Sequence, residues 1–255
     1  MLKKRFIAVL IILEGKVVQS VKFKHTNVIH YDPVHAIEAF NKWSVDEIVV
    51  LNVSKKSESK SPFAETLERI SKECFVPISA GGWITDHQYA QTLLRSGADK
   101  LILNTAFFQN PSFAEELSDK YGKQCIVASM DVKKNETSQI RTVWVDRGRR
   151  DTGKHPKEWA EHVTKHGAGE IFFNSIDHDG ARKGYDELTV KELCQTVSIP
   201  VIAFGGIFRW PQLIKGFEAG AEGLAVANQL HYTEHAAKKA KRFLQEAGVP
   251  TRISS

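Results

Sequence analysis

An aspartate at the end of an apolar run is the residue of this chain best suited to catalysis. Asp131 directly follows Ala128–Met130, the last part of a run of strand length. If this run is a buried barrel strand, the carboxylate lies at the carboxyl ends of the strands, where barrel enzymes place their active sites. A carboxylate there can act as a general acid or base. The alternative is a structural bond to a neighbouring loop amide, and we favour catalysis.

Two pairs of glycines follow apolar runs in the same way. Gly81–Gly82 ends the run that begins at Pro77, and Gly205–Gly206 ends the run that begins at Pro200. Glycine lets the backbone approach a ligand closely and adopt a positive φ, and a helix that follows would direct free N–H groups at an anion. A single pair is more typical of an ordinary turn, but its duplication predicts two phosphate-binding loops.

Polar residues close three other apolar runs. Asn104–Thr105 and Ala227–Asn228 are expected beside the two glycine loops, where they could add hydroxyl and amide donors to each anion site. Asp177 is a second acidic candidate at a strand end. His231 and His235 are spaced i, i+4, but the glutamate between them does not fit the zinc-binding pattern His-Glu-x-x-His, so we predict no metal site.

Segments near the glycine pairs also recur in the second part of the chain. They are Ser96–Leu101, which recurs as Ala219–Leu224, and Asp46–Val50, which recurs as Gly169–Phe173. The recurrence predicts a duplicated and fused half, with halves at about 1–122 and 123–255. Aligning Phe6–Ile11 with Ile126–Asp131, at an offset of 120 residues, makes Ile11 the position equivalent to Asp131, so an apolar residue stands where a two-carboxylate mechanism would place its second acid.

Apolar runs of strand length alternate with segments of helical periodicity. Most runs are apolar throughout and rich in β-branched residues, as expected for parallel strands buried on both faces. Eight such units in 255 residues predict an α/β fold, a single (β/α)8 TIM barrel built from two repeated half-barrels, with an open doubly wound sheet as the alternative. We expect strands at 5–12, 47–52, 76–80, 100–104, 124–130, 170–174, 200–204 and 223–227, and helices at 33–43, 86–96, 111–121, 156–166, 186–197, 211–219 and 233–247.

Three longer connections interrupt this alternation. They are expected at 14–31, 53–62 and 133–155, with a hairpin within Ile140–Val145. Each follows a strand and therefore lies at the carboxyl ends, where mobile lids over a site would be unsurprising.

The composition is typical of a cytosolic globular protein that binds an anionic small molecule. The apolar content of 42% suffices for a sizeable core. Cys74, Cys125 and Cys194 are widely spaced in or beside apolar runs, so we expect reduced thiols. The net charge of +5 is spread along the chain without the motif of a nucleic-acid module. No apolar run reaches membrane-spanning length, Phe6–Leu13 is interpreted as a first strand rather than a signal peptide, and no cofactor is indicated.

Four charged residues stand at the opposite ends of the predicted strands. Arg5, Glu47, Lys100 and Glu170 begin or precede the first, second, fourth and sixth strands. Such residues share the amino-end mouth of a barrel and can form a ring there. By themselves they indicate a stabilising ionic cluster, because this face of a barrel usually contributes stability rather than catalysis.

Over essentially its whole length the chain resembles the cyclase subunit of imidazole glycerol phosphate synthase, the HisF family. The motifs that carry the resemblance are Lys4–Ala8, Asp46–Val49, Ala80–Gly82, Gly97–Lys100, Asn104–Ala106, Ser175–Gly180, Gly184–Asp186 and Ala203–Gly206. The resemblance implies a (β/α)8 barrel that receives ammonia from a separate glutaminase subunit at its amino-end face. It implies that the ammonia crosses the barrel and attacks a bis-phosphorylated aminoimidazole carboxamide ribonucleotide, which yields imidazole glycerol phosphate and an aminoimidazole carboxamide ribotide.

The resemblance also assigns roles to residues. The two phosphates of the substrate account for the two glycine loops, and Asp131 matches one of the family's two catalytic aspartates. The family's ammonia gate is matched by Arg5, Glu47, Lys100 and Glu170. Asp99 and Gln124 match positions near the glutaminase interface.

Several positions depart from the family pattern. The second catalytic aspartate, on the first strand, is replaced by Ile11, which cannot exchange a proton. The other departures are Gln19 for a loop lysine, Asn52 for an aspartate on the second strand, Trp83 for a third glycine and Phe204 for a serine. General acid–base groups typically contribute about 10²–10⁴-fold to a rate. Cyclase chemistry is therefore not expected, whereas ammonia passage is.

This pattern resembles a second-copy branch of the family. Its members pair with a glutaminase and supply ammonia to a separate sugar amidotransferase of surface-polysaccharide biosynthesis, where a sugar acetamido group becomes an acetamidino group. We expect this function. A working cyclase of histidine biosynthesis that tolerates Ile11 and a phosphate-binding sugar phosphate isomerase are the alternatives. Ile11 and Gln19 argue against the cyclase, and the intact gate argues against the isomerase.

Overall fold

The predicted strands are present in the structure. The computed structural model describes residues 3–135, 137–231 and 235–252. The predicted strand boundaries agree with those observed to within two residues, except at the fifth strand, β7, which starts later and continues to Lys134. The strands are β1 (Arg5–Leu13), β4 (Glu47–Asn52), β5 (Ile78–Gly81), β6 (Lys100–Leu103), β7 (Ile126–Lys134), β10 (Glu170–Ser175), β11 (Val201–Phe204) and β12 (Gly223–Val226).

The hydrogen-bonded order of these strands returns to its start. Neighbouring strands pair in the order β10-β11-β12-β1-β4-β5-β6-β7, and β10 also pairs with β7. The pairs β1–β4, β4–β5, β7–β10, β10–β11 and β11–β12 are parallel. Parallel strands in a closed order, with helices between them, make a (β/α)8 barrel. The predicted fold class is therefore confirmed.

The chain divides into two compact units. Unit 1 comprises Met1–Ser20, His25–Leu101 and Ala225–Ser255, and unit 2 comprises Val21–Lys24 and Ile102–Leu224. These bounds differ from the halves at about 1–122 and 123–255 that the sequence repeat predicts. The duplication of a half-barrel stays a prediction.

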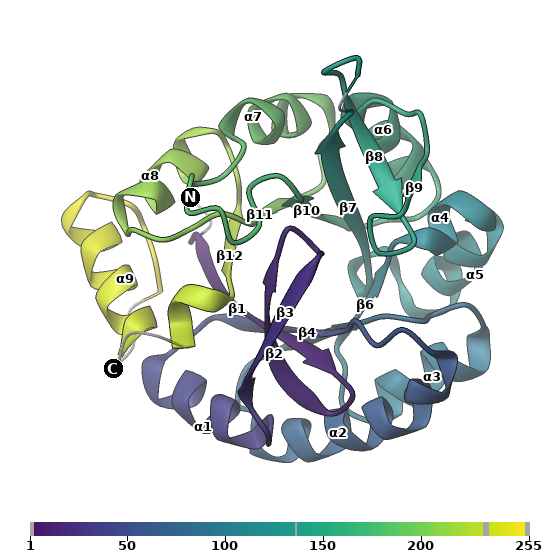
Figure 1. Cartoon of the computed structure of the whole chain (residues 1–255), viewed down its shortest axis with the longest axis horizontal. Helices are drawn as coiled ribbons and strands as arrows, with labels where there is room; N and C mark the ends of the chain where they lie inside the picture. Colours follow the sequence, from purple (N-terminus) through teal and green to yellow (C-terminus); the bar gives the residue numbers. More distant parts are fainter. Residues whose placement is uncertain (1–2, 136, 232–234, 253–255) are drawn as a thin grey trace. The chain divides into compact units, whose positions relative to one another are not determined.

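In unit 1, β1 and β4 contribute much of the core. Phe6–Ile12 of β1 are buried, and so are Ile48–Val50 of β4. Burial on both faces explains why these strands are apolar without alternation. The helices α1 (Val34–Trp43) and α2 (Lys60–Glu73) lie outside the two strands (Figure 1). The unit also contains α3 (His87–Arg95) and α9 (Ala236–Glu246).

In unit 2, β7 is extended by an antiparallel hairpin. Its last residues pair with β8 (Arg141–Val145), which pairs with β9 (Arg150–Asp151) (Figure 1). The segment in which the sequence predicts a hairpin, Ile140–Val145, is thus a single strand of a larger hairpin, and its pairing explains why β7 continues past Asp131. The helices of the unit are α4 (Thr105–Gln109), α5 (Pro111–Tyr121), α6 (Pro156–Lys165), α7 (Glu187–Thr196) and α8 (Pro211–Glu218). None of the described helices combines the length and apolar character that a membrane crossing requires.

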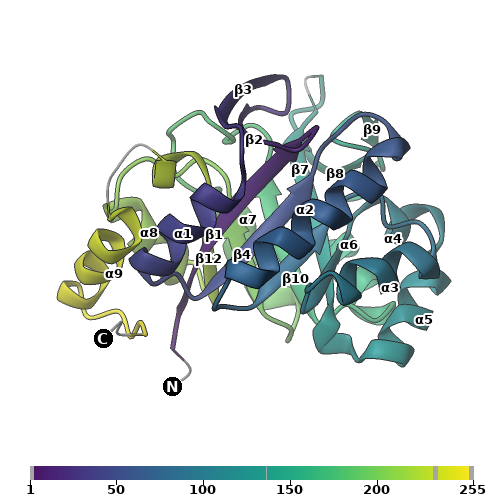
Figure 2. The same ribbon diagram turned by 90° about the horizontal axis from the view of Figure 1, so that it is seen from below.

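A hairpin occupies most of the connection that the sequence predicts as a loop at 14–31. It consists of β2 (Lys16–Val21) and β3 (His25–His30), and it stands at the carboxyl end of β1 (Figure 2). The chain turns back through Glu14 and Gly15, whose φ angles are 50° and 78°. This turn lets β2 pair antiparallel with the end of β1.

The helix α2 is also absent from the sequence prediction. Its first turns are rich in Ser, Lys and Glu, a composition that resembles a loop. The helix nevertheless buries Phe63, Leu67 and Ile70, which lie on one face because they are spaced by four and three residues. A narrow apolar stripe therefore suffices where the neighbouring strands supply the rest of the core.

Candidate functional site

Asp131 is held in the interior of unit 2 by two amide groups. It lies within β7, directly opposite Asn174 of β10, and is only 8% exposed. Its Oδ1 accepts a hydrogen bond from Asn174 Nδ2 at 3.2 Å, and its Oδ2 accepts one from Asn104 Nδ2 at 3.1 Å. Asp131 thus does bond to amide groups, as the structural alternative predicts, but the donors are side chains at two other strand ends and not a neighbouring loop. The carboxylate is fixed in one orientation.

The surroundings of Asp131 favour proton exchange near neutral pH. Burial raises the pKa of its carboxyl to about 7, and the nearby charge of Asp179 also raises it, while the hydrogen bond from Asn174 opposes the shift. A carboxyl group with a pKa near the working pH can both accept and donate a proton. Asp131 therefore has the properties of a general acid or base.

Asn174 is the polar residue of this site that the sequence does not predict. Its Oδ1 is buried and has no hydrogen-bond partner among the described residues. A Cβ on Gly205 would lie only 2.9 Å from this oxygen. Gly205 thus keeps space beside an unsatisfied acceptor. The register of β10 against β7 produces this arrangement, and only the strand-end position of Asn174 could have indicated it.

The second glycine pair has a clear packing requirement. Gly205 and Gly206 have φ angles of 94° and 92°, and a Cβ on Gly206 would overlap the carbonyl of Gly184. The Gly206 carbonyl also accepts the Gly184 N–H at 2.9 Å. Phe204, which precedes the pair, contacts Phe172 in a tilted arrangement with ring centroids 5.2 Å apart. The next helix, α8, begins at Pro211, as predicted, so four residues separate it from the glycine pair.

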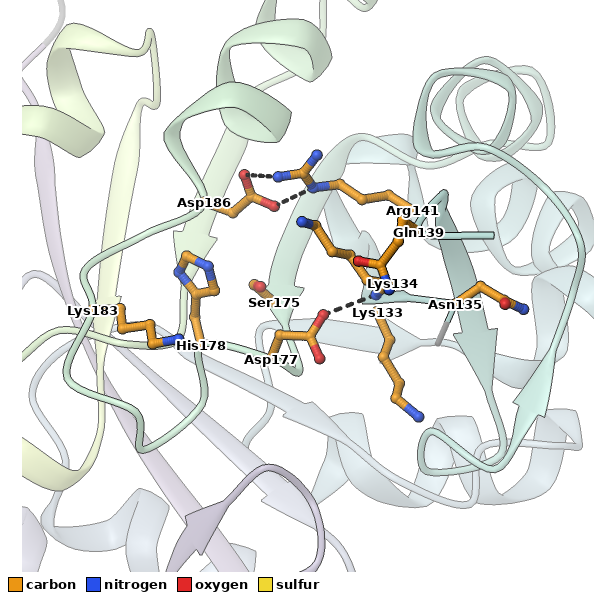
Figure 3. Close-up of a pocket in the computed structure, with 10 residues that line it drawn as sticks. All are labelled: Lys133, Lys134, Asn135, Gln139, Arg141, Ser175, Asp177, His178, Lys183 and Asp186. Carbon is orange, nitrogen blue, oxygen red and sulfur yellow. Dashed lines mark hydrogen bonds and ion pairs between the residues drawn. The ribbon is translucent and has the colours of Figure 1, made fainter. Parts of the chain in front are cut away.

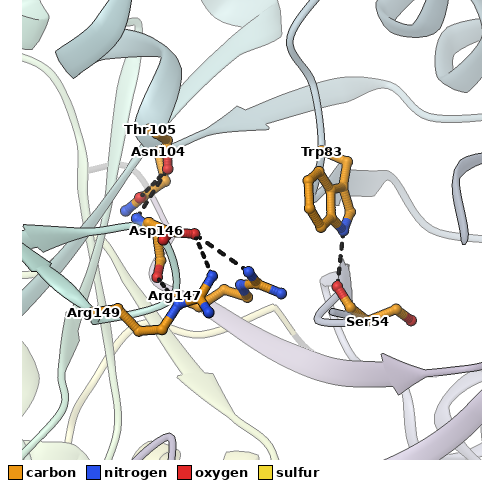
Figure 4. Close-up of polar contacts among 7 residues, drawn as sticks. All are labelled: Ser54, Trp83, Asn104, Thr105, Asp146, Arg147 and Arg149. Carbon is orange, nitrogen blue, oxygen red and sulfur yellow. Dashed lines mark hydrogen bonds and ion pairs between the residues drawn. The ribbon is translucent and has the colours of Figure 1, made fainter. Parts of the chain in front are cut away.

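Thr105 is covered by the turn between β8 and β9. Its Oγ1 accepts the Asp146 N–H at 3.0 Å and donates to Asn104 Oδ1 at 3.3 Å (Figure 4). The Asp146 carboxylate accepts hydrogen bonds from Arg149 at 2.9 Å and from Arg147 at 3.4 Å. The hydroxyl that the sequence predicts as a phosphate donor is therefore already engaged, and two arginines that the sequence does not predict stand beside it.

In unit 1, Ile11 is buried near the carboxyl end of β1. It lies opposite Leu51 of β4 and is 6% exposed. Gln19, the second departure from the family pattern, is half-buried in β2. Neither side chain can exchange a proton, so neither can replace the family residue at its position in acid–base chemistry.

The first glycine pair differs in detail from the second. Only Gly82 has a positive φ, of 110°, and a Cβ on it would overlap the Asn52 carbonyl. Gly81 is the last residue of β5. Trp83 has a φ of 59°, and its indole Nε1 donates to the Ser54 carbonyl at 2.8 Å (Figure 4). A left-handed backbone is rare for so bulky a residue.

The remaining predicted phosphate donors serve local structure in unit 1. Asn228 Nδ2 donates to the Ser20 carbonyl at 3.0 Å, and Ala227, which precedes it, is half-buried. The helix that follows the first glycine pair is capped by its own Asp86, whose carboxylate accepts the Tyr89 N–H at 2.7 Å. One of the N–H groups at the start of α3 is therefore engaged by its own cap, and anion binding there stays a prediction.

Three of the four predicted gate residues form an ion-pair network in unit 1. Glu47 accepts from Arg5 Nη1 at 2.8 Å through Oε1, and it pairs with Lys100 Nζ at 3.4 Å through Oε2. These side chains are 11%, 15% and 21% exposed. Each stands at the first residue of its strand, so the network lies at the amino ends. Glu170, the first residue of β10, is buried in unit 2.

The two predicted interface residues differ in their surroundings. Asp99 Oδ2 accepts the Ile78 N–H at 2.8 Å, so this side chain fixes the start of β5. Gln124 is exposed in a short 3₁₀ helix, Lys123–Cys125, and not at the start of a strand as predicted. Asp177, the other acidic candidate, accepts the Lys134 N–H at 2.8 Å and does not contact Asp131 through any of its described bonds.

Comparison with known proteins places the chain in a family. The histidine biosynthesis protein family matches residues 5–236. The chain is 38% identical over 254 residues to the imidazole glycerol phosphate synthase subunit HisF of Bacillus cereus, covering 99% of this chain and 100% of the relative. It is 35% identical over 253 residues to the subunit of that name from Pyrococcus furiosus, with the same coverage, and 35% identical over 256 residues to that from Caulobacter vibrioides, covering 100% and 98%. The chain therefore belongs to the histidine biosynthesis protein family, as a HisF-type member.

Proposed function

We propose that this protein is the barrel subunit of a glutamine-dependent amidotransferase, which accepts ammonia from a glutaminase subunit and conducts it to an acceptor held by another protein. The observation that carries the proposal is Ile11, an apolar buried residue at the end of β1 where the family mechanism uses an aspartate. Asp131 alone would then supply acid–base catalysis. Ammonia passage, in contrast, needs no carboxylate at position 11.

The amino-end network supports the same proposal. Arg5, Glu47 and Lys100 match the family's ammonia gate, and they are joined by ion pairs that are largely shielded from solvent. Glu170 is the fourth gate residue. In this proposal the glutaminase subunit docks at the amino ends of the strands, near Asp99 and Gln124.

The proposed acceptor is a sugar acetamido group, amidated by a separate sugar amidotransferase of surface-polysaccharide synthesis. This assignment rests on the combination of departures at Ile11, Gln19, Trp83 and Phe204, which resembles the second-copy branch of the family. The barrel would then deliver ammonia at the carboxyl ends of its strands instead of consuming it there.

A working cyclase is the second candidate, and the state of Asp131 favours it. This carboxyl has a pKa raised to about 7 by burial and is oriented by two amides, as an acid–base catalyst requires. In this candidate the two phosphates of the substrate would lie at the predicted phosphate-binding residues, which are Gly81, Gly82, Asn104, Thr105, Gly205, Gly206, Ala227 and Asn228.

A cyclase assay separates the two candidates. The purified chain is incubated with an ammonium salt and the family's ribonucleotide substrate, and imidazole glycerol phosphate is measured. The Bacillus cereus relative serves as the positive control under the same conditions. We expect little or no product from this chain. Turnover comparable to that of the relative would refute the proposal and establish the cyclase.

The ammonia route is tested separately with the glutaminase partner. Lys100→Ala breaks one of the two ion pairs of Glu47 and is expected to uncouple glutamine hydrolysis from ammonia use. The readout is the ratio of glutamate formed to amidated product. Lys72→Ala, on the exposed face of α2, is the control for loss of a lysine. An unchanged ratio in Lys100→Ala would count against a gate at this position.

A further inference from the structure

Unit 2 contains a basic pocket that is separate from the predicted phosphate-binding residues and from Asp131. One side of the pocket is formed by the end of β7 and the start of β8. The other side is formed by the end of β10 and the segment that follows it (Figure 3). Its volume is about 270 Å³. Its lining is polar throughout and includes Lys134, Arg141, Ser175, Asp177, His178 and Lys183.

Both carboxylates of the pocket are already engaged. Asp186 forms a two-pronged ion pair with Arg141, at 2.7 and 3.3 Å, and also caps α7 by accepting from Thr189. Asp177 Oδ2 accepts the Lys134 backbone N–H at 2.8 Å. Figure 3 shows these two contacts as separate dashed lines on different sides of the pocket. Neither acid therefore neutralises a lysine side chain.

The lysine ammonium groups provide the unbalanced charge. Lys133 is held over the Trp144 ring, 4.7 Å from its centroid. Within residues 3–135, 137–231 and 235–252, no carboxylate forms an ion pair with Lys134 or Lys183. The lining has four cationic side chains and two carboxylates, which leaves an excess of two positive charges. The cations are Lys133, Lys134, Arg141 and Lys183, and the carboxylates are Asp177 and Asp186. This excess matches a dianion such as a phosphate monoester.

Neutral hydrogen-bonding groups line the same pocket. His178 Nδ1 donates to the Gly184 carbonyl at 2.7 Å, which orients the ring and leaves Nε2 for a ligand. The side-chain oxygen of Asn135, Oδ1, accepts two backbone N–H groups, so the side-chain nitrogen Nδ2 is the group left to donate. The Ser175 hydroxyl adds a group that both donates and accepts. Such groups suit the hydroxyls of a sugar.

We propose that this pocket binds a phosphorylated monosaccharide, with the phosphate between Lys134 and Lys183 and the sugar hydroxyls toward His178 and Ser175. The volume of about 270 Å³ lies just below the range of about 300–1,000 Å³ found for pockets of drug-sized ligands, so it suits one sugar ring and not a nucleotide sugar. The proposal does not depend on the fate of ammonia or on Ile11.

Calorimetric titration with ribose 5-phosphate, at fixed ionic strength, tests the proposal. The double variant Lys134→Gln/Lys183→Gln is expected to bind about a hundredfold more weakly, since each charge-assisted hydrogen bond contributes roughly tenfold. The control is Lys157→Gln/Lys165→Gln on α6, which makes the same change in net charge away from the pocket. Equal weakening by both double variants would overturn the proposal, because the effect would then be one of overall charge.

Two further arms identify the ligand and the location. Inorganic phosphate is expected to bind more weakly than ribose 5-phosphate, and ribose not at all; equal binding of phosphate and sugar phosphate would overturn the assignment to a sugar. Asp177→Asn keeps an oxygen for the Lys134 N–H but removes a negative charge, so it is expected to strengthen binding severalfold. Loss of binding in Thr105→Val with no loss in Lys134→Gln/Lys183→Gln would move the ligand to the predicted phosphate loops and refute this pocket.

Discussion

The two ends of β1 offer very different chemistry. At the amino end, Arg5 is fixed by Glu47, which also pairs with Lys100. Near the carboxyl end, Ile11 is buried and lies opposite Leu51 of the paired strand β4. The Arg5 side chain is charged and held in place, whereas the Ile11 side chain is apolar and cannot exchange a proton. The reaction expected at the carboxyl ends and the ammonia entrance expected at the amino ends are therefore separable by mutation.

The carboxyl ends of β1 and β7 also differ in whether their side chains can exchange a proton. Asp131 of β7 has two amide donors and a pKa raised to about 7 by burial, so it can exchange a proton. Ile11 of β1 cannot. A two-residue acid–base mechanism needs a proton-exchanging group at both positions, so these two strand ends together supply only one of the two groups.

The largest expected effect comes from Ile11→Asp. If the missing carboxylate alone limits cyclase chemistry, this substitution raises the formation of imidazole glycerol phosphate from ammonium salt by on the order of 10²–10⁴-fold. Ile11→Asn is the matched control, because it places a polar group of the same size in the same buried position without an exchangeable acid. Equal activity of the wild type and both variants would show that Ile11 is not what limits the reaction.

The amino end is expected to depend on a buried ion pair that is distinct from the predicted gate. Lys241 of α9 donates to Asp46 at 2.7 Å, and the two side chains are 5% and 3% exposed. Asp46 also accepts the Phe6 N–H at 2.7 Å, which fixes the start of β1. Lys241→Met leaves an unpaired buried carboxylate and is expected to reduce the free energy of unfolding by about 3–5 kcal/mol in urea denaturation.

The double variant Asp46→Asn/Lys241→Met is the control for this pair. The asparagine oxygen can still accept the Phe6 N–H, and no charge is left without a partner. We expect it to recover much of the lost stability. A loss as large as in Lys241→Met alone would mean that packing of the lysine chain, and not its charge, holds α9 in place.

Residues at strand ends could be predicted from the sequence because parallel strands bring their like ends to one edge. That reasoning placed Asp131 at the carboxyl ends and Arg5, Glu47 and Lys100 at the amino ends, and it placed the strands themselves. It rests on local pattern alone. No knowledge of which strand neighbours which is needed.

Contacts that depend on register or on distant partners could not be predicted. Asn174 meets Asp131 only because β10 pairs with β7 in one register, and Lys241 reaches Asp46 from the other end of the chain. The turn at Asp146 covers Thr105 because β8 folds back on β7. In each case the side chain has an ordinary sequence context, and its role arises from the pairing of elements.

The proton on Asp131 makes a smaller and pH-dependent contribution. The folded-state pKa of about 7 lies above the ordinary value of 3.8, so the folded protein holds a proton that the unfolded chain has lost. Stability is therefore expected to fall as the pH rises from about 4 to about 7, by on the order of a few kcal/mol. Urea denaturation at both pH values measures this fall, and Asp131→Asn should remove most of it. Asp119→Asn, on the exposed face of α5, should leave it unchanged; an equal fall in wild type and Asp131→Asn would contradict the assignment.

The smallest expected effect concerns Trp83, which, like Ile11, is a bulky apolar residue near the carboxyl end of a strand of unit 1. It follows β5. Its left-handed backbone, with a φ of 59°, costs about 1–2 kcal/mol, while its indole bond to the Ser54 carbonyl contributes about 1 kcal/mol. Because the two terms oppose each other, Trp83→Gly is expected to change the free energy of unfolding by no more than about 1 kcal/mol. Trp83→Phe keeps the strain and loses the bond, so it serves as the control and is expected to be destabilising. If Trp83→Gly instead lost about 3–5 kcal/mol, as truncation of a core tryptophan does, then Trp83 would be part of the core of unit 1, and its strained backbone would be the cost of that packing.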